Sequence, residues 1–168
     1  MNLVLIGYRC AGKSTVGREL ARRLAMDFVD TDKLIEARHG LGVADIWRRL
    51  GESVFRELES DMITEVSRMD NTVISAGGGA VVRYKNLRNL RRTGRLVWLQ
   101  ADVDSILERL EHDAETVMRR PRFANCTLRA EVEQMLACRR SYYRCAADML
   151  VDTSGRTPAS VLGDLLGL

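Results

Sequence analysis

A glycine-rich motif near the amino terminus constrains this chain more than any other feature. Residues 7–15 read Gly-Tyr-Arg-Cys-Ala-Gly-Lys-Ser-Thr and satisfy the pattern G-x-x-x-x-G-K-[ST]. The motif follows the apolar run Leu3-Val4-Leu5-Ile6 and precedes a segment with helical periodicity. Backbone N–H groups of such a loop point at a polyphosphate beside the positive end of the helix. We therefore predict a strand–loop–helix unit that binds nucleotide phosphates.

Individual positions of this phosphate loop have separate chemical roles. Gly7 and Gly12 allow backbone bends that other residues resist. Lys13 can reach the terminal phosphates, and the hydroxyl of Ser14 can bind the accompanying Mg²⁺. The nucleotide-binding residues predicted in the loop are Cys10, Ala11, Gly12, Lys13, Ser14 and Thr15.

Strand-like and helical segments alternate along the chain, which predicts a parallel sheet covered by helices on both faces. The expected fold is a three-layer α/β architecture. With 168 residues and 46% apolar composition, the chain suits one domain spanning residues 1–168. The clearest strands are expected at Asn2–Ile6, Thr72–Ser75, Arg95–Leu99 and Asp148–Val151, and the clearest helices at about Ser14–Ala25 and Gly51–Met69.

Charge and cysteine spacing favour some classes of protein over others. The net charge of +3 is spread along the chain, so nucleic-acid binding is not indicated. The four cysteines show no C-x-x-C spacing, so neither a zinc site nor a redox motif is expected. No leader and no apolar run of membrane-spanning length are found, so we expect a cytoplasmic protein. In the absence of a long unpartnered apolar stripe we expect a monomer.

A charged segment near residues 111–127 interrupts the regular pattern. Its apolar periodicity lapses, and Arg119-Arg120-Pro121-Arg122 concentrates positive charge around a helix-breaking proline. Such a segment is typical of a mobile lid over an active site.

Two acidic residues follow a possible second strand at Phe28-Val29. In Asp30-Thr31-Asp32, Asp30 could hold Mg²⁺ through water, and Asp32 could accept or orient a substrate hydroxyl for attack on the γ-phosphoryl group. The alternative is structural, because an Asp or Thr before Lys33-Leu34-Ile35 can simply cap a helix. The sequence leaves both interpretations open.

A triple glycine, Gly77-Gly78-Gly79, follows the strand expected at Thr72–Ser75. Glycines at the carboxyl end of a parallel strand let a ligand approach backbone amides closely, although they can also form only a flexible turn. Other candidates are less informative. His39 and His112 lack partner ligands and are expected at the surface, whereas Trp47 and Trp98 are expected in the core.

Taken together, these motifs resemble the shikimate kinases, from the first strand to about Pro158. The phosphate loop, Asp30-Thr31-Asp32 and the triple glycine occur in the order and approximate spacing of that family. Further matches are the run Gly51-Glu52-Ser53-Val54-Phe55-Arg56-Glu57-Leu58-Glu59, the pair Arg120-Pro121, and Arg139 with Tyr143.

The resemblance implies a P-loop kinase that transfers the γ-phosphoryl group of Mg²⁺-ATP to the 3-hydroxyl of shikimate, in aromatic amino-acid biosynthesis. Catalytic roles would fall to Lys13, Asp32 and the lid residue Arg120, although Arg119 beside it leaves the lid cation uncertain by one position. Metal contacts would come from Ser14 and Asp30. Substrate contacts would come from Asp32, Arg56, Gly77, Gly78, Gly79 and Arg139, the last chosen over Arg140 from its spacing to Tyr143, and further ATP contacts from Arg109, Arg120, Arg156 and Pro158.

Two other kinds of function stay open from the residues alone. One is another small-metabolite P-loop kinase, of the gluconate or nucleoside-monophosphate type. The other is a nucleotide-dependent binding module without metabolic activity. A nucleotide acceptor would need a base pocket, whereas Asp32, Arg56 and Arg139 suit a small hydroxylated acid.

Overall fold

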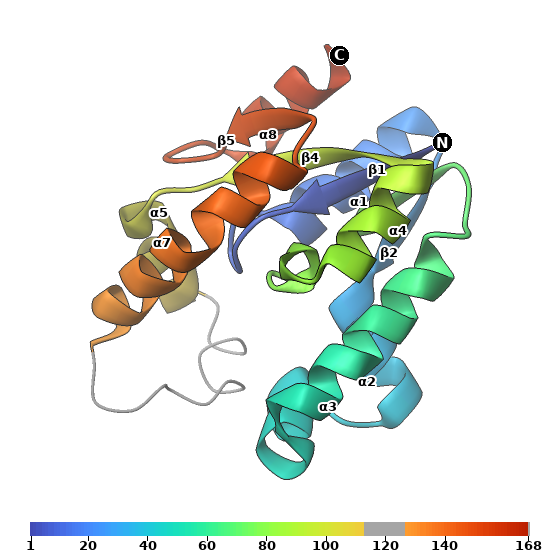
Figure 1. The fold of residues 1–168 in the computed structure, drawn as a ribbon. Helices are drawn as coiled ribbons and strands as arrows, with labels where there is room; N and C mark the ends of the chain where they lie inside the picture. The colour runs from blue at the N-terminus through green and yellow to red at the C-terminus, as the bar shows by residue number, and fades with distance from the viewer. Residues whose placement is uncertain (113–126, 168) are drawn as a thin grey trace.

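The computed structural model describes residues 1–112 and 127–167, which form a parallel sheet between two layers of helices (Figure 1). The predicted three-layer α/β fold is therefore confirmed. The strands are β1 (Asn2–Ile6), β2 (Asp27–Asp30), β3 (Thr72–Ser75), β4 (Gly94–Gln100) and β5 (Met149–Asp152). The helices are α1 (Lys13–Leu24), α2 (Thr31–His39), α3 (Val43–Val66), the 3-10 helix η1 (Ala80–Val82), α4 (Tyr84–Thr93), α5 (Val103–His112), α7 (Leu128–Ala146) and α8 (Pro158–Leu166).

The strand order is β2-β3-β1-β4-β5, and every neighbouring pair is parallel. The register places Val4 of β1 opposite Ile74 of β3 on one side and Leu96 of β4 on the other. Because all strands run in the same direction, their carboxyl ends lie along one edge of the sheet. Ligands of open α/β sheets bind at this edge.

Each face of the sheet has its own apolar core. One core joins the sheet to α2, α3, α4 and the last turns of α7, where Tyr143 and Ala146 are buried. The other joins it to α1, α5 and α8, together with Val132 near the start of α7. Helix α7 therefore contributes to both layers. Figure 1 shows α4 and α7 in front of the sheet and α1 behind β1.

Several predicted boundaries agree with the structure, and one helix differs. The strands Asn2–Ile6 and Thr72–Ser75 have the expected limits, and the possible strand at Phe28-Val29 exists as β2. The helix expected from Gly51 instead continues a segment that begins at Val43. Gly51 has φ 86° and ψ 165°, so it forms a sharp kink between the two parts of α3. Glycine tolerates this conformation because it has no Cβ.

Of the helices within the described residues, none combines the length and apolar character that a membrane span requires.

Candidate active site

The phosphate loop connects β1 to α1 in the predicted arrangement. Gly12 caps the first turn of α1 with φ 91°, and Gly7 has φ 140°. A side chain at Gly7 would collide with the carbonyl of Leu99. Both glycines therefore have conformations that other residues resist, as the motif requires. The loop leaves the amino end of α1 open to an anionic ligand.

The Lys13 side chain and the Cys10 backbone are both constrained by the loop. The Lys13 amine donates hydrogen bonds to the carbonyls of Gly7, at 2.9 Å, and Tyr8, at 2.8 Å. Cys10 has φ 57°, a left-handed conformation that costs an L-residue about 1–2 kcal/mol. Ser14 and Thr15, at the start of α1, are exposed. The loop thus holds its lysine over its own carbonyls while presenting both hydroxyl residues to solvent.

Asp30 caps α2, one of the two interpretations that the sequence left open, and it also contacts the phosphate loop. Its Oδ1 accepts hydrogen bonds from the amides of Asp32, at 3.1 Å, and Lys33, at 3.3 Å, which confirms that it caps α2. Its Oδ2 accepts a 2.5 Å hydrogen bond from the hydroxyl of Ser14. One carboxylate therefore fixes the start of α2 and also faces the phosphate loop.

The Ser14–Asp30 pair fits the chemistry of a magnesium site. A hydroxyl and a carboxylate oxygen are hard ligands, and Mg²⁺ commonly combines one or two such groups with substrate phosphates and water. Within residues 1–112 and 127–167, no three His, Cys, Asp or Glu side chains lie together as a metal cluster. A Mg²⁺ ion beside Ser14 and Asp30 would therefore depend on nucleotide phosphates for further ligands.

A cavity of about 270 Å³ opens beside the phosphate loop. The three residues expected to bind the acceptor, Asp32, Arg56 and Arg139, all line it, although they come from α2, α3 and α7. Arg140, the competing choice for the last position, is exposed. Further lining residues include Tyr8, Arg9, Trp47, Phe55, Glu59, Gly78, Gly79, Glu131 and Met135.

Charged side chains lie close to the backbone at two positions of the triple glycine. A Cβ on Gly77 would lie 2.7 Å from Oε1 of Glu59 and 2.8 Å from Oδ1 of Asp32. A Cβ on Gly79 would lie 2.8 Å from Cζ of Arg56. Gly78 and Gly79 line the cavity, whereas Gly77 is buried beneath the two carboxylates. Steric crowding therefore favours glycine at residues 77 and 79, whereas a Cβ on Gly78 would have no neighbour closer than 3.4 Å.

Arg56 is held in place by carboxylates and an aromatic ring. It donates from Nη1 to Glu59 at 2.9 Å and from Nε and Nη2 to Glu52 at 3.3 Å, and its Cζ lies 5.2 Å from the centre of the Trp47 ring. Glu59 is only 1% exposed, and burial raises its pKa although Arg56 opposes the shift. Arg139 forms no ion pair with another described residue. Of the three arginines that line the cavity, Arg9 and Arg56 are thus paired with carboxylates of the described residues, whereas Arg139 is not.

Several residues of this cavity were not predicted from the sequence. Glu59 lies one helical turn after Arg56, a spacing that could have indicated an ion pair. Trp47 was expected in the core, but it is only half-buried and lines the cavity; Trp98 is buried as expected. A partly buried ion pair of 2.9 Å between Arg9 of the phosphate loop and Glu131 of α7 had no local signal, since the two residues are distant in sequence.

Of the further residues predicted to contact ATP, Arg109 lies on α5, Arg156 lies between β5 and α8, and Pro158 begins α8. Arg109 donates to the carbonyl of Cys10 at 3.1 Å and to the carbonyl of Thr153 at 2.5 Å, and so ties the phosphate loop to this neighbouring segment. The guanidinium of Arg156 bonds Asp164 at 2.7 Å, which turns it toward α8. Pro158 is exposed at the first position of α8.

Some predicted residues lie outside the described part of the chain. These are Arg120, Arg119 and nearly all of the lid segment predicted at 111–127. His39 and His112 are both exposed, as expected.

Comparisons with known proteins identify the family of this chain. The family model for shikimate kinase matches residues 9–167. A shikimate kinase from Symbiobacterium thermophilum is 39% identical, over 99% of this chain and 94% of the relative, and one from Pseudomonas entomophila is 42% identical, over 98% and 94%. The solved structure of a shikimate kinase from Acinetobacter baumannii in complex with shikimate superposes with a TM-score of 0.90 at 30% identity, covering 98% of this chain and 90% of the other. This chain belongs to the shikimate kinase family.

Proposed function

We propose that the cavity holds shikimate beside the phosphate loop, so that the γ-phosphoryl group of ATP passes to its 3-hydroxyl. As a member of the shikimate kinase family, the protein is an ATP-dependent shikimate kinase of the aromatic amino-acid pathway. The observation that carries the proposed geometry is that Asp32, Arg56 and Arg139 line one cavity together with Tyr8 and Arg9 of the loop. Acceptor and nucleotide would therefore meet directly.

The charges of the cavity match a small hydroxylated acid. Arg139 and Arg56 would bind the carboxylate of shikimate, and each guanidinium can donate two parallel hydrogen bonds. Asp32 would accept hydrogen bonds from the substrate hydroxyls. The amides of Gly78 and Gly79 would complete the polar surface, with Gly77 supporting Asp32 from beneath. An acceptor without a carboxylate would leave the cations unpaired, which is unfavourable in a partly buried site.

The phosphate loop and its neighbours would bind ATP. Backbone amides from Cys10 to Thr15 would surround the phosphates, and Lys13 would exchange its bonds to the carbonyls of Gly7 and Tyr8 for the terminal phosphates. Adenine would lie against Arg109, Arg156 and Pro158. Arg109 donates to the carbonyl of Cys10 in the phosphate loop and to the carbonyl of Thr153, which precedes Arg156 and Pro158 in the chain, and these contacts support the assignment.

Ser14 and Asp30 would hold Mg²⁺, Asp30 through water. An ion held there would neutralise part of the phosphate charge.

Catalysis by the chain itself would rest on positioning and charge. Phosphoryl transfer develops little covalent bonding to the protein, so fixed cations contribute most of the rate enhancement. Lys13 would stabilise the transferring group, and Arg120 of the predicted lid would do so from the other side. Asp32 would orient the 3-hydroxyl and accept its proton. We also propose a cytoplasmic monomer of one domain that binds neither nucleic acid nor membranes.

A parallel assay of acceptors tests this function. Purified protein with Mg²⁺-ATP is supplied with shikimate, gluconate or nucleoside monophosphates, and acceptor-dependent ADP release and phosphorylated product are measured. We expect shikimate 3-phosphate only. Turnover of gluconate or a nucleotide instead would contradict the acceptor assignment, and nucleotide binding without any product would indicate a binding module.

A further inference from the structure

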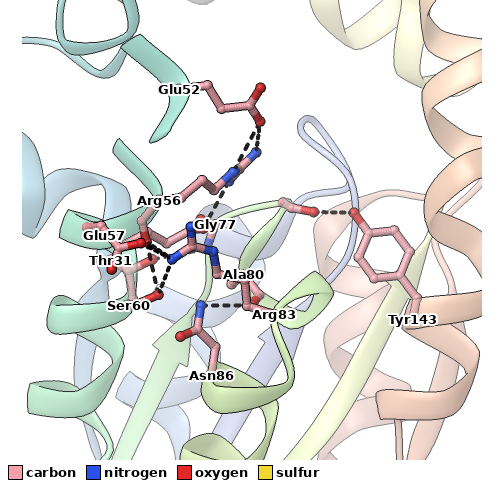
Figure 2. A network of polar contacts seen from close by, with 12 residues as sticks. Thr31, Glu52, Arg56, Glu57, Ser60, Gly77, Ala80, Arg83, Asn86 and Tyr143 are labelled. Carbon is pink, nitrogen blue, oxygen red and sulfur yellow. Dashed lines mark hydrogen bonds and ion pairs between the residues drawn. The ribbon is translucent and has the colours of Figure 1, made fainter. Parts of the chain in front are cut away.

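Three buried side chains anchor the glycine turn from three different helices (Figure 2). The amide of Gly77 donates to Oγ1 of Thr31 at 3.0 Å, the Nδ2 of Asn86 donates to the carbonyl of Ala80 at 3.0 Å, and the Tyr143 hydroxyl donates to the carbonyl of Gly78 at 2.6 Å. Thr31 and Asn86 are 0% exposed, and Tyr143 is 1% exposed. The turn that lines the acceptor cavity is therefore fixed at both ends and in its middle.

Tyr143 contacts the central part of this turn. It lies on α7 one turn after Arg139, whose Nη1 would lie 3.4 Å from a Cβ on Gly78. A single face of α7 thus brings a guanidinium and a hydroxyl to the same glycine. The Tyr143 ring packs against Trp98, with ring centres 5.7 Å apart, so the hydroxyl has a fixed position.

The Tyr143 hydroxyl is a constant hydrogen-bond donor at physiological pH. Burial raises the pKa of Tyr143 to about 12, against an opposing effect of Arg139. The phenol therefore stays protonated, and the carbonyl of Gly78 is the acceptor that fixes its direction.

Fixing this carbonyl also fixes the next amide. In a trans peptide the C=O and the following N–H point in opposite directions. With the Gly78 carbonyl directed at α7, the Gly79 N–H is directed away from α7. Two glycines in succession have wide backbone freedom, so without such an anchor this peptide unit could rotate. Among the described residues, no hydrogen bond occupies the amide of Gly78 or Gly79.

We propose that Tyr143 is a positioning residue for the acceptor, because its hydroxyl holds the Gly78–Gly79 peptide so that amides of the turn are presented to the acid in the cavity. This inference rests on the proposed function of the same site. It assigns Tyr143 no contact with substrate and no proton transfer. Its effect falls on acceptor affinity and leaves the nucleotide side unchanged.

The substitution Tyr143→Phe tests this role, because it removes one oxygen and keeps the ring against Trp98. We expect the KM for shikimate to rise about tenfold, as for the loss of roughly one hydrogen bond to a buried group, while the KM for ATP stays within twofold. Tyr142→Phe is the matched control, since Tyr142 is adjacent on α7 and 45% exposed. A purely structural role would lower the thermal midpoint and leave both KM values unchanged, which would overturn the proposal.

A second measurement uses the unaltered protein and so does not depend on the folding of the variant. With ¹⁵N-glycine labelling, titration with shikimate should shift the amide resonance of Gly79 or Gly78 more than that of Gly163, which lies on α8. Unchanged Gly78 and Gly79 resonances at saturating shikimate would refute the proposal. If the unaltered protein neither binds nor phosphorylates shikimate, the proposed function itself is wrong. That outcome differs from a Tyr143→Phe variant with unchanged KM values, which would overturn only the role of Tyr143.

Discussion

The phosphate loop and the acceptor cavity lie side by side, yet they are built in opposite ways. The loop is one continuous segment that presents backbone amides, and its hydroxyl residues Ser14 and Thr15 are exposed. The cavity is assembled from distant segments, and its charged side chains are held by one another, as in the pair Arg56–Glu59. A ligand common to many proteins is thus bound by backbone, whereas a specific acid requires a preorganised set of side chains.

This contrast explains what the sequence could predict. The phosphate loop has a fixed spacing that follows from its chemistry, so its residues and the flanking strand and helix were identified directly. Arg56 and Arg139 have no such spacing, and each taken alone resembles an ordinary surface charge, while Asp32 could equally have capped a helix. Only the resemblance to a family brought them together.

The missed features have the same physical origin. Glu59 and Trp47 lie on a helix whose pattern indicates a solvent-exposed charge and a core aromatic, and only tertiary packing turns both toward the cavity. The part of α3 before Gly51 was also missed, since a glycine within an apolar stripe indicates an end rather than a kink.

The largest expected effect is a loss of catalysis from a change in the phosphate loop. Lys13→Met should lower kcat by about 1000-fold, because it removes a cation that stabilises the transferring phosphoryl group. Calorimetric affinity for shikimate should stay within twofold. Lys85→Met, on the exposed surface of α4, is the control. A reduction of kcat below tenfold would contradict the role of Lys13.

The next largest effect is weaker binding of the acceptor after a change in the cavity. Arg56→Met should raise the KM for shikimate by about 100-fold, as for the loss of a bidentate charged contact, with little change in the KM for ATP. Because the variant leaves Glu59 buried without its partner, the double variant Arg56→Met/Glu59→Gln serves as a control for folding. Equal changes in both KM values would refute the assignment of Arg56.

Alkylation of Cys10 should weaken the binding of nucleotide at the phosphate loop. The thiol lies within the phosphate loop and is half-buried, so an added N-ethylmaleimide group should weaken nucleotide binding by roughly tenfold or more through steric overpacking. The Cys10→Ser variant should resist this inactivation. Full activity after labelling at Cys10 is verified by mass spectrometry would rule out the prediction.

The smallest effect concerns the strain in the phosphate loop. Since Cys10 has φ 57°, Cys10→Gly should increase the free energy of unfolding by about 1 kcal/mol, whereas Cys10→Ala should not. Chemical denaturation of the three proteins measures the difference. Equal stability of the glycine and alanine variants would show that this backbone conformation carries no cost.

The most direct test of the central claim is a crystal structure with shikimate and ADP bound together. The account predicts the acid in the cavity, with its carboxylate within about 3 Å of the guanidinium groups of Arg56 and Arg139 and a hydroxyl at similar distance from Asp32, facing the phosphate loop. Shikimate bound elsewhere, or in the cavity with its carboxylate turned away from both arginines, would contradict it.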